Sequence, residues 1–432
     1  MNPIRITRRQ FLKWLSASAA ALGLSQTDLL KIEEALAAGP VPDPLNPLGP
    51  TGLGINAGTL LRVIWIAGAA CSGCPTSLLN YIADTTDPDP VLAAIANNGI
   101  PGYPLVELDG LYPLGAMPES GIDIAEVVVE IVTIDYAQII MAASGDVPNL
   151  YMKNLRDAGG YVLMTEGTIQ TAQGGKYCRI LDMPDPGGAS IPSGVWDPYI
   201  TRYVDGVLGA RVEMTMAGAT LWLAQNAVAV VALGTCASYG GVPAAKGSVT
   251  GGKGTWEFLN ANGMGDKIIL NVPGCPPHPD WFVATAGAAI LELHGIMPGI
   301  LLDNLDTSID HLGRPKLTYC SPGNTIYHKD ATYVYCQNCP RSQTKPGPVQ
   351  TGTATSLEAC RRKGGQPNGQ CMENNGCCGY LAGPKFVRAD CPTRKWNNHT
   401  NWPVGNNFPC NGCTDPGFPD KNSPFFKRTK NA

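Results

Sequence analysis

Short apolar runs, separated by polar and helical sequence, recur through residues 59–300. The first run, LRVIWI at residues 61–66, is rich in β-branched residues and predicts a strand buried on both faces. Further runs that predict strands lie at residues 125–133, 160–167, 227–233 and 267–272. Residues 183–199 indicate a loop that leads into helical sequence ending at Asn226. Because strands alternate with helical sequence, the pattern predicts an α/β fold built on a doubly wound parallel sheet.

Three of these predicted strands end in cysteine. Cys71 and Cys74 form a CxxC pair after the first strand, where Pro75 predicts the start of a helix, and Cys236 and Cys275 each follow a later strand. The carboxyl ends of parallel strands lie along one edge, so four thiolates can converge there. Four cysteine sulfurs suit a 4Fe–4S cluster or a structural zinc ion. The scattered strand ends favour the cluster, because zinc sites usually use two close CxxC pairs.

Residues 301–432 have a different character. Helical periodicity is weak there, Gly, Pro, Asn and Cys dominate, and ten of the 15 cysteines of the chain fall in this region. A region with so small an apolar core needs disulfide bonds or bound metal to stabilise its fold. A disulfide-rich secreted module would satisfy that need. The odd total of cysteines and two further CxxC pairs, Cys336/Cys339 and Cys410/Cys413, argue instead for metal binding.

Length and charge narrow the classes of function. The 432 residues exceed what one hydrophobic core usually fills, so we expect two domains, at residues 59–300 and 301–432. The net charge of −4 gives no reason to expect nucleic acid as a partner. Charged residues make up only 15% of the chain, which suits a large obligate interface with a protein partner.

The N-terminus predicts export. Residues 7–13 read TRRQFLK, a twin-arginine pattern that is followed by a weakly apolar segment and by a small-residue cleavage site, ALA, at residues 35–37. We therefore expect a signal peptide over residues 1–37 and a Pro/Gly-rich leader over residues 38–58; a basic amphipathic helix is the alternative. The twin-arginine route carries folded proteins with their cofactors. This places the protein in the periplasm or on the outer face of the cytoplasmic membrane.

Over nearly its whole length the chain resembles the small subunit of exported nickel–iron hydrogenases. The family motifs CxxC, GTC and GCPP match residues 71–74, 234–236 and 274–277. The resemblance implies a flavodoxin-like first domain, followed by an irregular C-terminal domain that binds iron–sulfur clusters. It also implies that a proximal 4Fe–4S cluster is held by Cys71, Cys74, Cys236 and Cys275.

The resemblance implies a distal 4Fe–4S cluster in the C-terminal domain. Its ligands would be Cys336, Cys339, Cys371 and Cys377. The family usually has a histidine at the first of these positions. Cys336 replaces it here, which keeps four ligands but makes the site more anionic and should lower its reduction potential. His328 lies nearby without the matching spacing and is the lesser candidate.

A medial 3Fe–4S cluster completes the set implied by the resemblance. Its ligands would be Cys391, which precedes a Trp-Asn pair, and the CxxC of Cys410 and Cys413. Pro403 stands where a fourth ligand could lie, and three thiolates with a proline match the 3Fe–4S type. The three clusters together use eleven cysteines.

The chain departs from the family at several positions. Oxygen-tolerant relatives carry extra cysteines where Gly73 and Gly241 stand, so we expect an ordinary proximal cubane. Thr76 replaces a glutamate that many members carry, which puts a carboxylate or proton path there in doubt. The cysteines without a cluster role are Cys178, Cys320, Cys360 and Cys378. The first is expected to be a buried small hydrophobe, and the other three could include a disulfide or another distal ligand.

The resemblance implies an electron-relay subunit of a heterodimer and no catalytic residue in this chain. The nickel–iron centre would lie in the large subunit, and electrons would leave through the clusters to a cytochrome or iron–sulfur protein that docks near Cys336. Membrane association would come through a partner. Two alternatives stay open: a relay in a related complex for hydrogen sensing or sulfur reduction, and a secreted, disulfide-stapled binding protein without iron.

Overall fold

The computed structural model describes most of the first predicted domain and a short part of the second. The described residues are 61–82, 132–278 apart from 189, 192, 193 and 195, then 281–282, 285, 309–310, 312–315, and 402–420 apart from 407. The signal peptide 1–37 and the leader 38–58 lie outside them. So do His328, Cys320, Cys336, Cys339, Cys360, Cys371, Cys377, Cys378 and Cys391.

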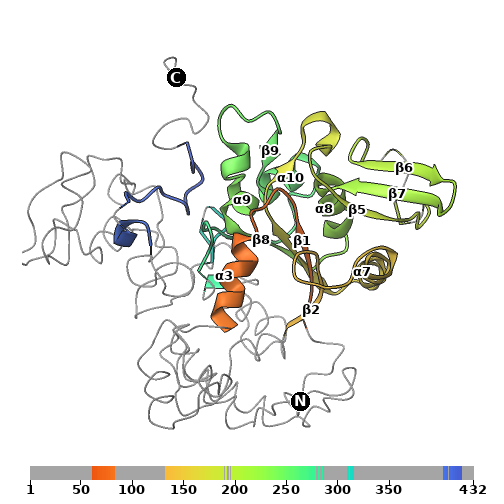
Figure 1. The fold of residues 1–432 in the computed structure, drawn as a ribbon, viewed down its shortest axis with the longest axis horizontal. Helices are drawn as coiled ribbons and strands as arrows, with labels where there is room; N and C mark the ends of the chain where they lie inside the picture. The colour runs from red at the N-terminus through yellow and green to blue at the C-terminus, as the bar shows by residue number, and fades with distance from the viewer. Residues whose placement is uncertain are drawn as a thin grey trace, which may run out of the picture.

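A five-stranded parallel sheet forms the centre of the fold (Figure 1). Its strands are β1 (Leu61–Ala67), β2 (Val132–Ala137), β3 (Tyr161–Glu166), β8 (Ala229–Leu233) and β10 (Ile269–Val272), in the order β10-β8-β3-β1-β2. Numbered along the chain within this sheet, the order is 2-1-3-4-5, which is the flavodoxin-like arrangement. The predicted α/β parallel sheet is confirmed. Ligands of such sheets bind beyond the strand ends where the order reverses, between β1 and β3.

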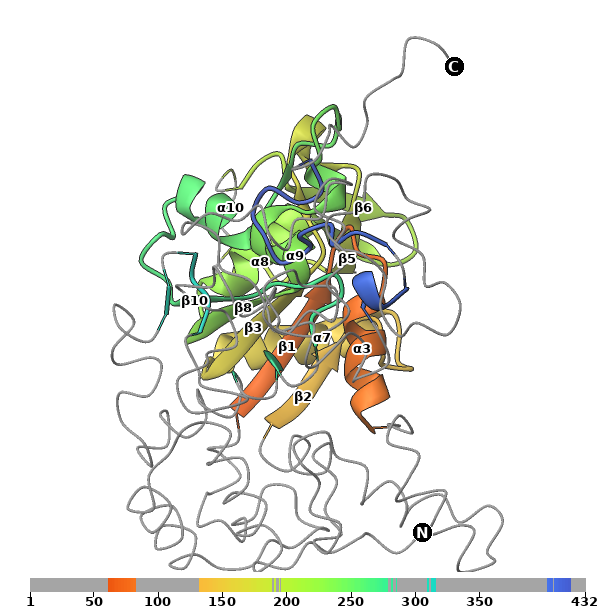
Figure 2. The same ribbon diagram turned by 90° about the vertical axis from the view of Figure 1, so that its left-hand side faces the viewer.

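Helices cover both faces of this sheet. They are α3 (Gly73–Ile82), α7 (Asp146–Ala158), α8 (Met216–Ala224), α9 (Gly234–Tyr239) and α10 (Thr255–Ala261), with 3-10 turns η2 (Ala172–Gly175), η3 (Val242–Ala244) and η5 (Val404–Asn406). Helix α3 lies across one face, and α7 and α8 lie on the other (Figures 1 and 2). No helix in the described ranges is both long and apolar enough to cross a membrane.

A three-stranded antiparallel sheet corrects one expectation from sequence. Residues 200–215, expected to be helical, form β6 (Ile200–Asp205) and β7 (Gly209–Thr215), which pair with β5 (Arg179–Pro184) in the order β5-β7-β6. The Asp205 carboxylate accepts the amides of the turn that joins β6 to β7. Asp205 therefore stabilises the turn of the β6–β7 hairpin. In β5, buried and exposed positions alternate, as expected for a strand with one buried face. A two-residue pair, β4 (Ile169–Gln170) with β9 (Gly252–Lys253), completes the strands.

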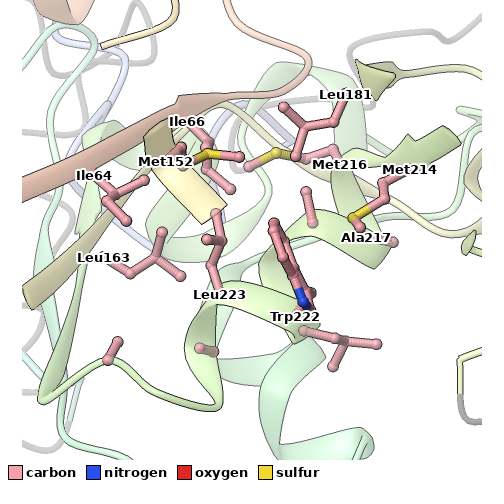
Figure 3. Packing of buried hydrophobic residues seen from close by; sticks show 14 of the residues in the cluster. Ile64, Ile66, Met152, Leu163, Leu181, Met214, Met216, Ala217, Trp222 and Leu223 are labelled. Atoms are coloured by element: carbon pink, nitrogen blue, oxygen red, sulfur yellow. The ribbon is translucent and has the colours of Figure 1, made fainter. Parts of the chain in front are cut away.

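A hydrophobic cluster lies between the two sheets around α8 (Figure 3). All nine residues of α8 are buried, as expected of a helix that is apolar on every side. Trp222 of this helix packs beneath the guanidinium of Arg156, which lies 4.8 Å from the ring centroid and donates to the Trp222 carbonyl at 2.9 Å. Ile64 and Leu163 reach the same cluster from β1 and β3. The cluster therefore fixes the strands whose ends carry the cysteines.

Candidate metal centre

The first two cysteines lie at the turn between β1 and α3. Cys71 is exposed, and Cys74 stands in the first turn of α3 with its Sγ 3.8 Å from the carbonyl oxygen of Leu233, the last residue of β8. Ser72, between them, has φ 61, which turns the chain sharply from strand to helix. The CxxC pair thus sits at the carboxyl end of β1, where the strand order reverses.

Hydrogen bonds join the other two cysteine-bearing turns to this one. Cys236 lies in α9, which starts directly after β8, and Cys275 follows β10. The Thr235 amide donates to the Gly274 carbonyl at 2.9 Å, and the Gly274 amide donates to Thr235 Oγ1 at 2.9 Å. Ser77 Oγ of α3 donates to the carbonyl of Pro277 at 2.8 Å. All four predicted proximal cysteines therefore lie at one edge of the sheet.

The electrostatics of these thiols shows that they share one site. Burial raises the pKa of Cys74 well above its ordinary value, and the negative charges of Glu166, Cys236, Cys275 and Cys71 raise it further, in that order. Burial likewise raises the pKa of Cys275 to about 12, with Cys236 and Cys71 as the charged neighbours. Four thiolates so placed repel one another unless a cation lies among them, and a coordinating metal deprotonates a thiol outright.

Glycines leave room around the sulfurs. A Cβ on Gly234 would lie 2.6 Å from Cys74 Sγ, and a Cβ on Gly241 would lie 2.8 Å from Cys236 Sγ. Both glycines also have positive φ, at +85° and +53°, which side-chain-bearing residues rarely adopt. A side chain at either position would therefore occupy the space beside a cysteine sulfur.

The donor set at this edge is four thiols, which is what an iron–sulfur cluster takes. In the described part of the chain no group of three or more His, Cys, Asp or Glu residues is arranged to hold one metal ion. A tetrahedral zinc site has Zn–S bonds of about 2.3 Å, which draws its sulfurs close together. A 4Fe–4S cubane has one thiolate on each of four irons, so its cysteines stand further apart. The four thiols therefore fit an iron–sulfur cluster.

Glu166 belongs to the same edge and was not identified from the sequence. It is the last residue of β3, it is only 1% exposed, and neither carboxylate oxygen has a partner at hydrogen-bonding distance in the described ranges. Burial raises the pKa of Glu166 to about 7, and this effect is larger than the lowering of the pKa by the indole of Trp65. An acidic residue closing an otherwise apolar strand, beside strands that end in cysteine, was the available signal.

The CxxC of Cys410 and Cys413 lies at this edge as well. Both cysteines are buried, and the Gly412 amide donates to Cys410 Sγ at 3.4 Å. Burial raises the pKa of Cys413 well above its ordinary value, and the charge of Cys275 is the next largest cause. The segment 402–420 passes beside α9, where the Thr235 hydroxyl donates to the Cys413 carbonyl (Figure 2). Two of the three predicted medial ligands are thus brought together beside the four strand-end cysteines.

The remaining predicted positions either have a place in the fold or lie outside the described residues. Pro403 is part of the turn around η5, and its carbonyl accepts the amides of Asn406 and Phe408. Cys178 packs against the hydrophobic cluster, as expected of a small hydrophobe. None of the seven cysteines in the described ranges forms a disulfide. The five predicted ligands of the distal and medial clusters that lie outside these ranges are Cys336, Cys339, Cys371, Cys377 and Cys391.

Two protein families match the chain. The family described as NADH ubiquinone oxidoreductase, 20 Kd subunit, matches residues 116–289. The family described as the C-terminal part of the NiFe/NiFeSe hydrogenase small subunit matches residues 350–426. The first match covers most of the parallel sheet and two of the four strand-end cysteines. The second covers the CxxC near the end of the chain.

Similar curated proteins agree with these matches. The periplasmic [NiFeSe] hydrogenase small subunit of Desulfomicrobium baculatum is 30% identical over 423 residues, which cover 98% of each chain. The periplasmic [NiFe] hydrogenase small subunit of Solidesulfovibrio fructosivorans is 25% identical, over 98% of this chain and 93% of its own. The quinone-reactive Ni/Fe-hydrogenase small chain of Wolinella succinogenes is 27% identical, over 97% and 83%. None of these three supports the sulfur-reducing or binding-protein alternative.

Solved structures show the same likeness. The [NiFeSe] hydrogenase of Desulfomicrobium baculatum superposes with a TM-score of 0.56 and 28% identity, covering 85% of this chain and 99% of that one. The [NiFeSe] hydrogenase of Desulfovibrio vulgaris Hildenborough gives a TM-score of 0.55 at 28% identity, covering 85% and 98%. The chain therefore shares the fold of these neighbours.

Proposed function

Since the chain belongs to the family of nickel–iron hydrogenase small subunits, we propose that it relays electrons from a hydrogen-splitting large subunit to an external acceptor. The observation that carries the proposal is the convergence of four thiols on one edge of the sheet, with glycines in place of side chains around their sulfurs. That arrangement fits an iron–sulfur cluster.

Three clusters are assigned to the chain. The proximal 4Fe–4S cluster would be held by Cys71, Cys74, Cys236 and Cys275, the distal 4Fe–4S cluster by Cys336, Cys339, Cys371 and Cys377, and the medial 3Fe–4S cluster by Cys391, Cys410 and Cys413. When bound, such clusters accept and release one electron at a time. The protein adjusts their potentials through burial, hydrogen bonds to sulfur and nearby charge. The Gly412 amide at Cys410 Sγ and the carboxyl group of Glu166 are two such groups.

The proposed partners follow from the same assignment. The large subunit would hold the nickel–iron centre next to the proximal edge, and the acceptor, a cytochrome or an iron–sulfur protein, would dock near Cys336. Export through the twin-arginine signal at residues 1–37 would place the complex in the periplasm or at the outer face of the membrane, held there by a partner. Relatives named as periplasmic and quinone-reactive support this location.

The test is reduction by hydrogen. The chain is purified without oxygen as a complex with its large subunit, exposed to H2, and followed by visible absorbance and by electron paramagnetic resonance (EPR). In the unaltered complex we expect H2 to bleach the iron–sulfur absorbance. Cys275→Ala should lose the proximal cluster and the bleaching, because the other clusters are then cut off from the large subunit.

Cys178→Ala is the matched control, because Cys178 is a thiol that packs against the hydrophobic cluster and is not among the proposed ligands. It should retain the iron and the bleaching of the unaltered complex. The proposal fails if H2 reduces the Cys275→Ala complex as fast as the Cys178→Ala complex.

A further inference from the structure

Thr235 connects three segments that carry predicted cluster ligands. It is 1% exposed and lies in the first turn of α9, next to Cys236. Its amide donates to the Gly274 carbonyl, and its hydroxyl oxygen accepts the Gly274 amide, each at 2.9 Å. The same hydroxyl donates to the backbone carbonyl of Cys413. One buried side chain thus contacts the turns of Cys236, Cys275 and Cys413.

The chemistry of the hydroxyl fixes the direction of these bonds. A threonine hydroxyl has one proton to donate, and a backbone carbonyl can only accept, so that proton points at the Cys413 carbonyl. The lone pairs of the oxygen remain available to the Gly274 amide. Because the side chain is buried, water does not replace either bond when the hydroxyl is removed. A valine of the same shape would leave both backbone groups unpaired.

The bond to Cys413 reaches the ligand-bearing residue itself. The segment 402–420 has another polar contact with the sheet domain, from the Lys246 amide to Asp420 Oδ2 at 2.5 Å, but that contact lies seven residues further along the chain. Thr235 is therefore placed to fix Cys413 relative to the four strand-end cysteines.

We propose that Thr235 is a positioning residue that sets the contact between the proximal and medial clusters through its hydrogen bond to the Cys413 carbonyl. The inference rests on the proposed function, because it requires both clusters. It also gives a continuous route between the two ligand sets, from Cys236 through the adjoining peptide and the Thr235 side chain to Cys413.

The experiment compares Thr235→Val with Thr235→Ser in the complex with the large subunit. Fully reduced samples are examined by EPR for the splitting of the proximal signal by its paramagnetic neighbour, and iron per chain is measured on each. Thr235→Ser keeps the hydroxyl and should keep the splitting. Thr235→Val should bind iron but lose the splitting, and amide exchange in the peptide 408–420 should be about tenfold faster, as expected for one lost buried hydrogen bond.

A control separates this role from the general loss of a buried hydroxyl. Thr255 is 0% exposed and shares a hydrogen bond of 2.8 Å with Thr165 of β3. Thr255→Val should keep the splitting. If Thr235→Val does not accumulate, Thr235→Ala is used instead, because it removes the same hydroxyl and is smaller. The EPR splitting in Thr235→Ala is then compared with that in Thr235→Ser.

The outcomes distinguish this inference from the proposed function. Unchanged splitting in Thr235→Val or Thr235→Ala with full iron overturns the role of Thr235 and leaves the relay intact. Equal loss of splitting in Thr255→Val also overturns it. An unaltered complex without iron would instead refute the proposed function.

Discussion

At the scale of single residues, the site depends on glycines, which leave space beside the sulfurs, as much as on the cysteines. Gly234 combines φ +85° with a position where a Cβ would lie 2.6 Å from Cys74 Sγ. Gly209 has nearly the same φ, +82°, but no atom within 4 Å of its Cβ position. Replacement by alanine therefore has the same backbone cost at both glycines, and only Gly234 meets a sulfur.

We predict that Gly234→Ala loses the proximal cluster, whereas Gly209→Ala retains it. Each substitution should cost about 1–2 kcal/mol for an L-residue in the left-handed region. Gly234→Ala should in addition displace the Cys74 thiolate and lower the iron content by about four atoms per chain. Iron analysis and the EPR spectrum of the reduced complex measure this. Equal iron content in the two variants would show that the space left by Gly234 beside Cys74 is not needed for cluster binding.

Glu166 predicts a pH dependence of stability. Burial raises its pKa from an ordinary 4.5 to about 7, so the folded chain holds this proton more tightly than the unfolded chain does. Its stabilising contribution is complete below about pH 4.5 and is lost as pH rises through about 7, by about 3 kcal/mol in total. Glu166→Gln stays neutral at every pH. The difference between its thermal unfolding midpoint and that of the unaltered chain should therefore become more positive from pH 5 to pH 8. Parallel pH profiles would contradict this.

At the scale of elements, α8 is packed too closely against the strand β6 to accept one more carbon. A Cβ on Gly218 would lie 2.5 Å from the Tyr199 carbonyl oxygen and 2.8 Å from Ile200 Cγ1. Glycine to alanine in a helix normally stabilises by about 1 kcal/mol. Here overpacking against backbone should reverse the sign.

We predict that Gly218→Ala destabilises the fold by about 1–3 kcal/mol. The measurement is the thermal unfolding midpoint, which should fall. Gly206→Ala is the control, because Gly206 has open space around its Cβ position and an ordinary φ, and its midpoint should stay within a degree or so of the unaltered chain. A rise in the midpoint of Gly218→Ala would mean that the helix can move away from the strand.

The sequence predicted β1, β3, β8 and β10 because each lies in a mostly apolar run, and it predicted the grouping of Cys71, Cys74, Cys236 and Cys275 because parallel strands end together. It placed the remaining strand at 125–133, whereas β2 is Val132–Ala137, which contains Thr133 and Asp135. It did not predict β6 and β7. Residues 200–215 mix charged and apolar side chains and run directly into α8, so the helical pattern extended too far. The contact of Thr235 with Cys413 joins residues 178 positions apart, and no local pattern records it.

At the scale of the whole molecule, the flavodoxin-like sheet would serve, in the proposed relay, as a platform for the proximal cluster and as a docking surface for the segment that carries two of the proposed medial ligands. Ser77 bonds to the turn after β10, and Thr235 and Lys246 both bond to the segment 402–420, so polar contacts hold this edge together. This arrangement would hold the clusters of a relay at fixed spacing within one chain.

The most direct test of that account is the iron and acid-labile sulfide content of the complex purified without oxygen, measured together with its EPR spectrum in the oxidised state. Three clusters on the eleven assigned cysteines predict about eleven irons per chain and the signal of an oxidised 3Fe–4S cluster. About twelve irons without that signal would retain the relay but place a fourth ligand at the medial cluster. A chain without iron, its cysteines joined in disulfides, would contradict the account.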